Sequence, residues 1–335
     1  MVMTKQRVTQ MLGALFLVGS LCVGAAGCAV FPAEGIGVST GPSTTPRTPK
    51  PSTGATADDS VRVTYPAPNA DPNQNFGDLY LPRGRHEPGT VPLVVLIHGG
   101  GWKNRASLKY MADVAAGLRD AGLAVWNIEY RRVGSGGGWS TTFTDVGNAV
   151  DHVPALAGAA PMLDTANVIL VGHSAGGQLA AWAATRRTLP QGAPGVTWAP
   201  GGGPSVTPRA FVSMAGVLDM RTSSRLNDHV RNALGGMPDQ VPDRYALANP
   251  IQRIDPAMPS VAIHGSKDAV VPASEATAFV DAAREQGAPS LLMQLNGAGH
   301  GTPATTRSRW WPAIRDAIVT LATRGFGALA ASPPR

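Results

Sequence analysis

Short apolar runs alternate with amphipathic stretches of helical length along residues 61–323 of this chain. The runs at 93–97 and 167–171 are almost entirely apolar, which is typical of strands buried on both faces of a parallel sheet. This alternation predicts an α/β fold, with a mostly parallel central sheet of about eight strands and helices on both faces. The predicted strands are residues 61–65, 76–81, 93–97, 124–128, 167–171, 210–214, 260–264 and 291–295. The predicted helices are residues 108–121, 144–156, 175–187, 274–286 and 308–323.

Two segments interrupt this alternation. Residues 191–208 are rich in Gly and Pro and predict a loop. Residues 220–253 separate two predicted strands and contain a short helical pattern around 226–234. We expect this second segment to form a small cap insertion over a site at the edge of the sheet.

The sequence Gly-His-Ser-Ala-Gly-Gly at 172–177 directly follows a predicted strand and precedes a predicted helix. A strand that ends in Gly-x-Ser-x-Gly makes a turn so tight that Gly172 and Gly176 have no room for a Cβ. Such a turn exposes the hydroxyl of Ser174 above the sheet, near the positive end of the following helix. The pattern predicts a nucleophilic serine; the alternative is a plain connecting turn.

A second glycine-rich motif, His-Gly-Gly-Gly-Trp at 98–102, follows the strand at 93–97. Consecutive glycines let backbone N–H groups converge on one oxygen, as an oxyanion hole requires. We expect the donors to be the N–H groups of Gly100, Gly101 and Ala175. A flexible turn or a phosphate cradle is the alternative, but no phosphate-binding pattern follows the glycines.

An acid and a base follow two later strands. Asp268 and His300 come after the strands at 260–264 and 291–295, and the carboxyl ends of parallel strands meet at one edge of a sheet. We expect His300 to accept the proton of Ser174 and Asp268 to orient the imidazole. Asp219, after the strand at 210–214, is the alternative acid.

Other polar and aromatic residues have supporting or undecided roles. We expect His98, Glu129 and Tyr130 to brace the glycine loop, and His264 to brace the loop of Asp268. Three histidines are predicted to be solvated: His86, His152 and His229. The candidates for an apolar acyl or aryl wall, each also interpretable as a core residue, are Trp102, Trp139 and Met220.

Together these motifs resemble those of α/β-hydrolases of the esterase and lipase kind with an HGGGW oxyanion loop. The chain is similar to hormone-sensitive-lipase-like carboxylesterases and, more closely, to the bacterial feruloyl-esterase-like and kynurenine-formamidase-like group. The resemblance implies the same Ser174–Asp268–His300 triad and a substrate that is an ester, an amide or a formamide. The segments that carry it are 98–102, 127–131, 172–177, 248–251, 264–272 and 299–301.

The N-terminal region predicts export. Lys5 and Arg7 precede an apolar stretch at 11–26, and the small residues before Cys28 resemble a bacterial lipobox. We therefore expect a lipoprotein-type signal peptide at 1–27, a lipid anchor at Cys28, a Ser/Thr/Pro/Gly-rich tether at 28–60 and a catalytic domain at 61–328. The expected location is the outer side of the cell membrane, with simple secretion as the alternative.

Composition narrows the chemistry further. The net charge of +6 falls to +4 without Lys5 and Arg7, which is too small and scattered to favour a nucleic-acid partner. The sequence has no His-Glu-x-x-His and no cysteine cluster, so we expect neither a metal nor a cofactor. The predicted function is a serine carboxylesterase that cleaves small-molecule esters through an acyl-enzyme on Ser174. The alternatives are an amide or formamide hydrolase and a non-catalytic envelope-binding protein; the sequence indicates no oligomeric state.

Overall fold

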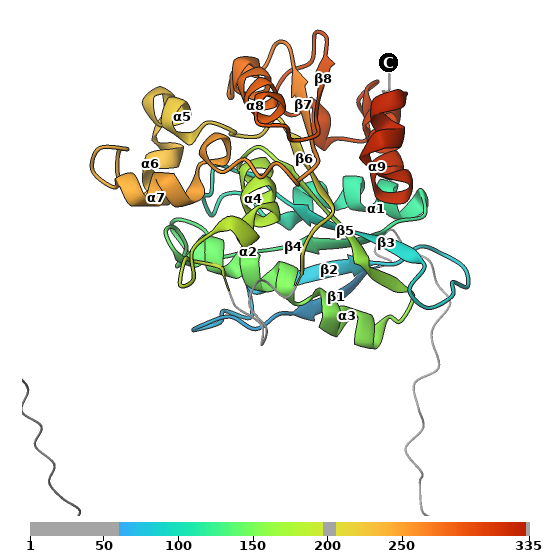
Figure 1. Ribbon diagram of the computed structural model, residues 1–335. Helices are drawn as coiled ribbons and strands as arrows, with labels where there is room; N and C mark the ends of the chain where they lie inside the picture. The colour runs from blue at the N-terminus through green and yellow to red at the C-terminus, as the bar shows by residue number, and fades with distance from the viewer. Residues whose placement is uncertain (1–59, 197–205, 333–335) are drawn as a thin grey trace, which may run out of the picture. The chain divides into compact units, whose positions relative to one another are not determined.

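An eight-stranded sheet forms the centre of the computed structural model, which describes residues 60–196 and 206–332 (Figure 1). The strand order is β1-β2-β4-β3-β5-β6-β7-β8. Strands β3 to β8 are parallel, while β1 and β2 run antiparallel at one edge, as the sequence predicts. The strands are β1 Ser60–Thr64, β2 Phe76–Tyr80, β3 Val91–Ile97, β4 Ala124–Ile128, β5 Leu163–His173, β6 Ala210–Met214, β7 Ser260–Gly265 and β8 Ser290–Leu295.

Helices cover both faces of this sheet (Figure 1). In β3, Leu93, Val95 and Ile97 pack in a core cluster with α2, α3, α4 and α8, whereas Val94 and Leu96 pack in a second cluster with α1 and α9. Successive side chains of a strand point to opposite faces, so a strand covered on both sides needs apolar residues throughout. The helices are α1 Ala112–Asp120, α2 Thr141–Asp151, α3 Val153–Ala159, α4 Ala175–Ala184, α8 Ala273–Glu285 and α9 Trp311–Ala331.

Three predicted helices differ from the observed ones. The stretch at 144–156 is two helices, because Pro154 stands in the first turn of α3 and cannot continue α2. The stretch at 108–121 opens with a 3-10 turn, Leu108–Met111, before α1 begins. The last helix continues past 323 to Ala331, with a kink at Gly325.

The order in which successive strands join the sheet reverses at β3. The chain passes from β3 to β4 on one side of it and then crosses to β5 on the other side. In open α/β sheets the crevice for ligands lies at such a reversal, beyond the carboxyl ends of the strands. The glycine loop at 98–102 and the turn at 172–177 follow β3 and β5, so the fold places both at this crevice.

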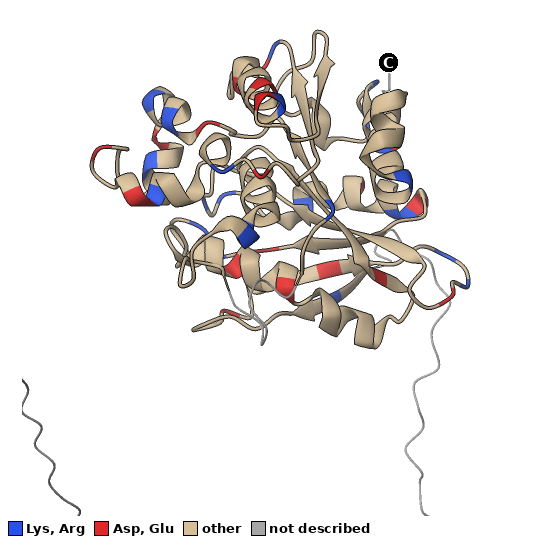
Figure 2. Ribbon diagram, in the orientation of Figure 1, with Lys and Arg blue, Asp and Glu red and all other residues tan. Residues whose placement is uncertain are grey.

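Three helices, rather than the single predicted one, form the insertion between β6 and β7: α5 Met220–Leu226, α6 Asp228–Leu234 and α7 Pro242–Ala248. The side chains of Asp219 and Asn227 accept hydrogen bonds from the N–H groups of Arg221 and His229. Each is a helix N-cap, and two caps begin two helices. Figure 2 shows basic residues along this insertion with acidic residues among them. Its arginines are Arg221, Arg225, Arg231, Arg244 and Arg253.

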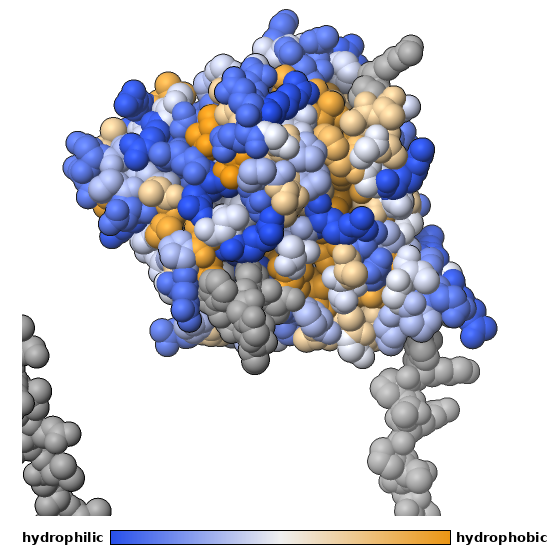
Figure 3. All heavy atoms as spheres, viewed as in Figure 1, coloured by the Kyte–Doolittle hydropathy of each residue, from blue (hydrophilic) through white to orange (hydrophobic). Residues whose placement is uncertain are grey.

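The surface is mixed in character. Figure 3 shows a mainly hydrophilic face with apolar residues in between. No helix in the described ranges is both long enough and apolar enough to cross a bilayer. The predicted signal peptide at 1–27, the lipidation site Cys28 and the predicted tether at 28–60, except for Ser60 at the start of β1, lie outside the described residues and stay predictions.

Candidate active site

The turn between β5 and α4 holds Ser174 in a strained conformation. Its φ of 56° and ψ of −120° lie in a region that non-glycine residues rarely adopt. The Ser174 N–H donates to the Met214 carbonyl at 2.9 Å, which ties the turn to the neighbouring strand β6. A Cβ on Gly172 would collide with the Gly176 carbonyl oxygen, so the predicted need for glycine in this turn is confirmed.

The structure brings the three predicted side chains together. Nε2 of His300 lies 3.0 Å from Oγ of Ser174, and Nδ1 of the same ring lies 2.8 Å from Oδ2 of Asp268. The three residues follow β5, β7 and β8, whose carboxyl ends share one edge of the sheet. The Asp268 side chain is fully buried, whereas 19% of the His300 side chain is exposed. This arrangement can pass a proton from the hydroxyl to the imidazole and stabilise the resulting charge.

Asp268 is held as a carboxylate. Burial alone raises its pKa, but hydrogen bonds from His264, His300 and the N–H groups of Val270 and Val271 outweigh burial and hold the pKa well below its usual range. Nε2 of His264 lies 3.1 Å from Oδ2 of Asp268 and 3.0 Å from the Val271 carbonyl. The prediction that His264 braces this loop is confirmed.

Asp219, the alternative acid, is not beside His300. Its Oδ1 accepts from the Arg221 N–H at 3.0 Å and its Oδ2 from the Thr222 hydroxyl at 2.6 Å. Both oxygens therefore serve the N-terminus of α5. That alternative is wrong, because the carboxylate is committed to capping a helix.

The glycine loop lies directly against the serine. A Cβ on Gly99 would lie 2.8 Å from the Cβ of Ser174 and 2.5 Å from the His173 carbonyl oxygen. Among the described residues, the N–H groups of Gly100, Gly101 and Ala175 have no hydrogen-bond acceptor. These three N–H groups thus keep their hydrogen-bonding capacity, and their role as an oxyanion hole stays a prediction.

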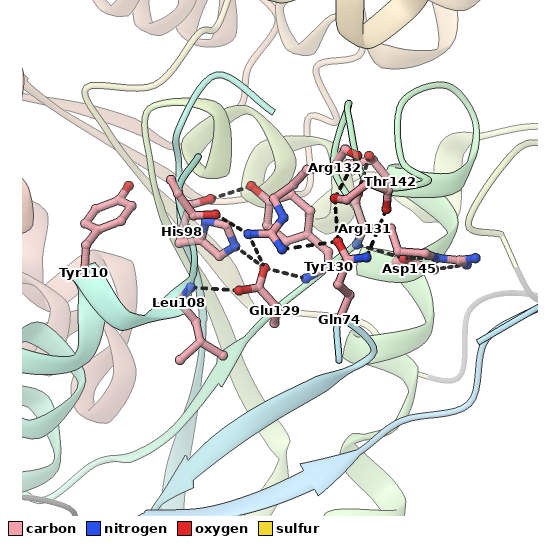
Figure 4. Close-up of polar contacts among 12 residues, drawn as sticks. Gln74, His98, Leu108, Tyr110, Glu129, Tyr130, Arg131, Arg132, Thr142 and Asp145 are labelled. Carbon is pink, nitrogen blue, oxygen red and sulfur yellow. Dashed lines mark hydrogen bonds and ion pairs between the residues drawn. The ribbon is translucent and has the colours of Figure 1, made fainter. Parts of the chain in front are cut away.

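A buried polar cluster around Glu129, which includes His98 and Tyr130, supports this loop (Figure 4). Nε2 of His98 lies 2.7 Å from Oε1 of Glu129, and the other carboxylate oxygen accepts from the Leu108 N–H. The Tyr130 hydroxyl donates to the His98 carbonyl at 2.7 Å, and the two rings stack at 4.4 Å. Burial raises the pKa of Glu129, but His98 and Arg132 outweigh it and lower that pKa. The predicted bracing role of His98, Glu129 and Tyr130 is confirmed.

His173 is buried beside the ring of His300, with 4.9 Å between the ring centroids. Burial lowers its pKa from the ordinary 6.5 to about 4. Between these values the unfolded chain binds a proton that the folded chain does not. The contribution of His173 to stability is therefore present above pH 6.5 and is lost as the pH falls towards 4.

This shift predicts a measurable loss of stability in mild acid. From pH 7 to pH 5, His173 is expected to lower the free energy of unfolding by about 2 kcal/mol. Urea unfolding of the wild type and of His173→Gln across this range measures the effect. The variant should show the flatter dependence on pH, and equal slopes would contradict the shift.

The apolar wall predicted from sequence is wrong for two of its three residues. Trp102 and Met220 are fully buried in the core. The Trp102 indole N–H donates to Oε1 of Gln178 at 3.2 Å, and the Met220 N–H donates to Oδ1 of Asn249 at 2.8 Å. Both side chains therefore belong to the core, which is the alternative that the sequence left open. Trp139 is half-buried against the ring of Phe143, and its role as a wall stays a prediction.

Two neighbours of the site were missed. A Cβ on Gly101 would lie 3.0 Å from the ring of His229, so α6 reaches over the glycine loop and this histidine is not simply solvated. The Tyr110 hydroxyl lies 2.6 Å from the Gly99 nitrogen. No local sequence signal marks either residue, because each contact joins segments far apart in the chain. Within the described ranges, no cluster of three or more potential metal ligands occurs.

Comparison with known proteins agrees with this architecture. Esterase LipC of Mycobacterium tuberculosis is 29% identical over 234 residues, which cover 66% of this chain and 56% of LipC. The chain thus matches little more than half the length of that relative. A truncated carbohydrate esterase from gut microbiota superposes with a TM-score of 0.66 at 24% identity, covering 81% of this chain and 99% of that one. Esterase Est2 of the planctomycete Thermogutta terrifontis gives 0.64 at 20% identity, covering 81% and 94%.

These structural matches show the α/β-hydrolase fold. A family model described as BD-FAE matches residues 77–282, a span that includes the glycine loop, Ser174 and Asp268. Because this match extends over more than half of the chain, the protein belongs to the BD-FAE family.

Proposed function

We propose that this protein is a serine carboxylesterase that hydrolyses small-molecule esters through an acyl-enzyme on Ser174. The observation that carries the proposal is the hydrogen-bonded chain from Ser174 through His300 to Asp268, beside three backbone N–H groups that have no acceptor among the residues the structure describes. Membership of the BD-FAE family and the likeness to a relative named as an esterase support the same activity.

The geometry accounts for the acylation step. As Oγ of Ser174 attacks the ester carbonyl, Nε2 of His300 at 3.0 Å accepts the hydroxyl proton. The carbonyl oxygen becomes an oxyanion, which the N–H groups of Gly100, Gly101 and Ala175 stabilise. His300 then gives the proton to the alkoxide oxygen as the C–O bond breaks, and the alcohol leaves.

Deacylation repeats these roles with water. His300 removes a proton from a water molecule, whose oxygen attacks the acyl carbon, and the proton returns to Oγ of Ser174 as the acid leaves. Asp268 stays ionised throughout, because its hydrogen bonds hold its pKa far below that of an ordinary carboxyl. Its charge stabilises the imidazolium formed twice in each cycle.

Covalent labelling tests the assigned nucleophile. Paraoxon should phosphorylate the protein once per chain, on the peptide that contains Ser174, and abolish turnover of p-nitrophenyl acetate in proportion. A phosphoryl group on a different residue would contradict the proposal.

A substrate panel tests the reaction class. We expect p-nitrophenyl acetate and ethyl ferulate to be hydrolysed with a higher kcat/KM than N-formylkynurenine. Turnover of the formamide alone would favour the amide and formamide alternative, and binding of esters without turnover would favour a non-catalytic protein.

A further inference from the structure

One chain of hydrogen bonds outside the catalytic triad joins all three loops of the site. The Tyr110 hydroxyl lies 2.6 Å from the Gly99 nitrogen and 2.9 Å from Nδ1 of His173. Nε2 of His173 lies 2.9 Å from the carbonyl oxygen of His300. The chain thus runs from the glycine loop, through the serine turn, to the loop of the catalytic histidine.

Because its pKa is lowered to about 4, His173 is neutral near pH 7, and a neutral ring fixes every proton in this chain. The Gly99 N–H can only donate and the His300 carbonyl can only accept. The Tyr110 oxygen therefore accepts from Gly99 and its proton goes to Nδ1 of His173. Nε2 of His173 then carries the ring's one proton and donates it to the His300 carbonyl.

We propose that Tyr110 and His173 are positioning residues, which set the glycine loop and the backbone of His300 in register with Ser174. The inference rests on the proposed function. Neither residue reacts: Tyr110 holds the peptide of Gly99, and His173 holds the peptide of His300. A displaced His300 backbone moves Nε2 away from the serine oxygen, and a displaced Gly99 moves the donors that follow it.

The location of Tyr110 supports this role over a purely structural one. The tyrosine is 38% exposed, so its ring adds little to the core. Its hydroxyl and the Cβ of Ser174 both lie 2.8 Å from the point that a Cβ on Gly99 would occupy, so the hydroxyl is a close neighbour of the nucleophile. In Figure 4, Tyr110 lies on the His98 side of the Glu129 cluster, and its ring meets that of His98 edge-on at 6.3 Å between centroids.

A neutral His173 also suits its surroundings. The groups around its ring are His300, Asp268, His264 and Tyr110. His300 must become a cation during catalysis, and a second cation at a ring distance of 4.9 Å would oppose that charge. We call the hydrogen-bonded chain Gly99–Tyr110–His173–His300 the bridge. A neutral histidine, which accepts at one ring nitrogen and donates at the other, completes this bridge without adding a charge.

Tyr110→Phe is the sharpest test, because it removes the hydroxyl and keeps the ring. We expect kcat for p-nitrophenyl acetate to fall by about 10- to 100-fold with KM within about twofold, since small misplacements of reacting groups cost this much. Tyr245→Phe is the matched control, because it also deletes one hydrogen-bonded tyrosine hydroxyl, which here donates to the Gly236 carbonyl at 3.0 Å. It should leave kcat unchanged.

The double variant tests whether the bridge acts as a unit. If the two residues act as a unit, kcat of the double variant Tyr110→Phe/His173→Gln should equal that of the less active single variant. Three outcomes would each overturn the inference. They are a wild-type kcat in Tyr110→Phe, an equal loss of kcat in Tyr245→Phe, and losses of kcat that multiply in the double variant. Because Tyr110 is partly exposed, Tyr110→Phe stays informative if His173→Gln does not fold.

Ser174→Ala, assayed in parallel, separates the inference from the proposed function. An inert Ser174→Ala together with a fully active Tyr110→Phe rejects the bridge alone. Turnover by Ser174→Ala places the nucleophile elsewhere and rejects both.

Discussion

Ser174→Ala is expected to lower kcat for p-nitrophenyl acetate by about 10⁶-fold, the size of loss seen when a triad nucleophile is removed. The variant keeps the glycine loop and His300, so a small residual rate from these groups should persist. Initial rates at high enzyme concentration, with paraoxon-treated wild type as the blank, measure the loss.

Stability provides the control for this variant. The backbone at residue 174 has a φ of 56°, a strain that serine and alanine share. The substitution removes only the hydroxyl, a catalytic group that is not selected for stability. The thermal midpoint should therefore stay at or above that of the wild type. A loss of activity with a lower midpoint would point to a misfolded variant, and retained turnover would remove Ser174 from the mechanism.

Asp268→Asn is expected to lower kcat by about 10⁴-fold, because an amide cannot hold the imidazole in the required tautomer or stabilise its cation. In the wild type, Oδ2 of Asp268 lies 2.8 Å from Nδ1 of His300 and 3.1 Å from Nε2 of His264. An amide NH₂ at this position would face both histidines and could not accept from either. KM should change little, since the substitution lies on the far side of His300 from the serine.

Asp219→Asn is the matched control for this substitution. Asp219 also follows a strand of the sheet, but its carboxylate caps α5, and asparagine caps helices nearly as well. We expect kcat within about twofold of the wild type. If the two variants lose activity equally, the assignment of the acid is wrong.

Much of this architecture could be predicted because its signals are local. Every strand appears within a few residues of its predicted bounds, since apolar runs such as 93–97 are specified by burial on both faces. The residues of the triad could be found because each stands in the loop that follows such a strand. Two errors also had local signals: Pro154 marks the break between α2 and α3, and Asn227 marks the start of α6.

The remaining errors depended on contacts between distant segments. Trp102 and Met220 follow strands as site residues do, but Gln178 and Asn249 bind their polar groups and the core encloses their side chains. In the sequence, Tyr110 is an ordinary residue of a predicted helix. Only the fold brings its hydroxyl to His173, which is 63 positions further along the chain. Periodicity reports which face of an element is buried, not which partner it meets.

The acid and base are attached to the two outermost strands of one sheet edge, β7 and β8, whereas Ser174 follows the central strand β5. A strand at an edge has a neighbour on one side only, so it separates from the sheet at lower cost than a central one. Detachment of β8 alone would carry His300 away while most of the hydrophobic core stayed intact. Hydrolysis should consequently cease in denaturant before the bulk of the fold melts, and during synthesis it cannot begin until the last strand has docked.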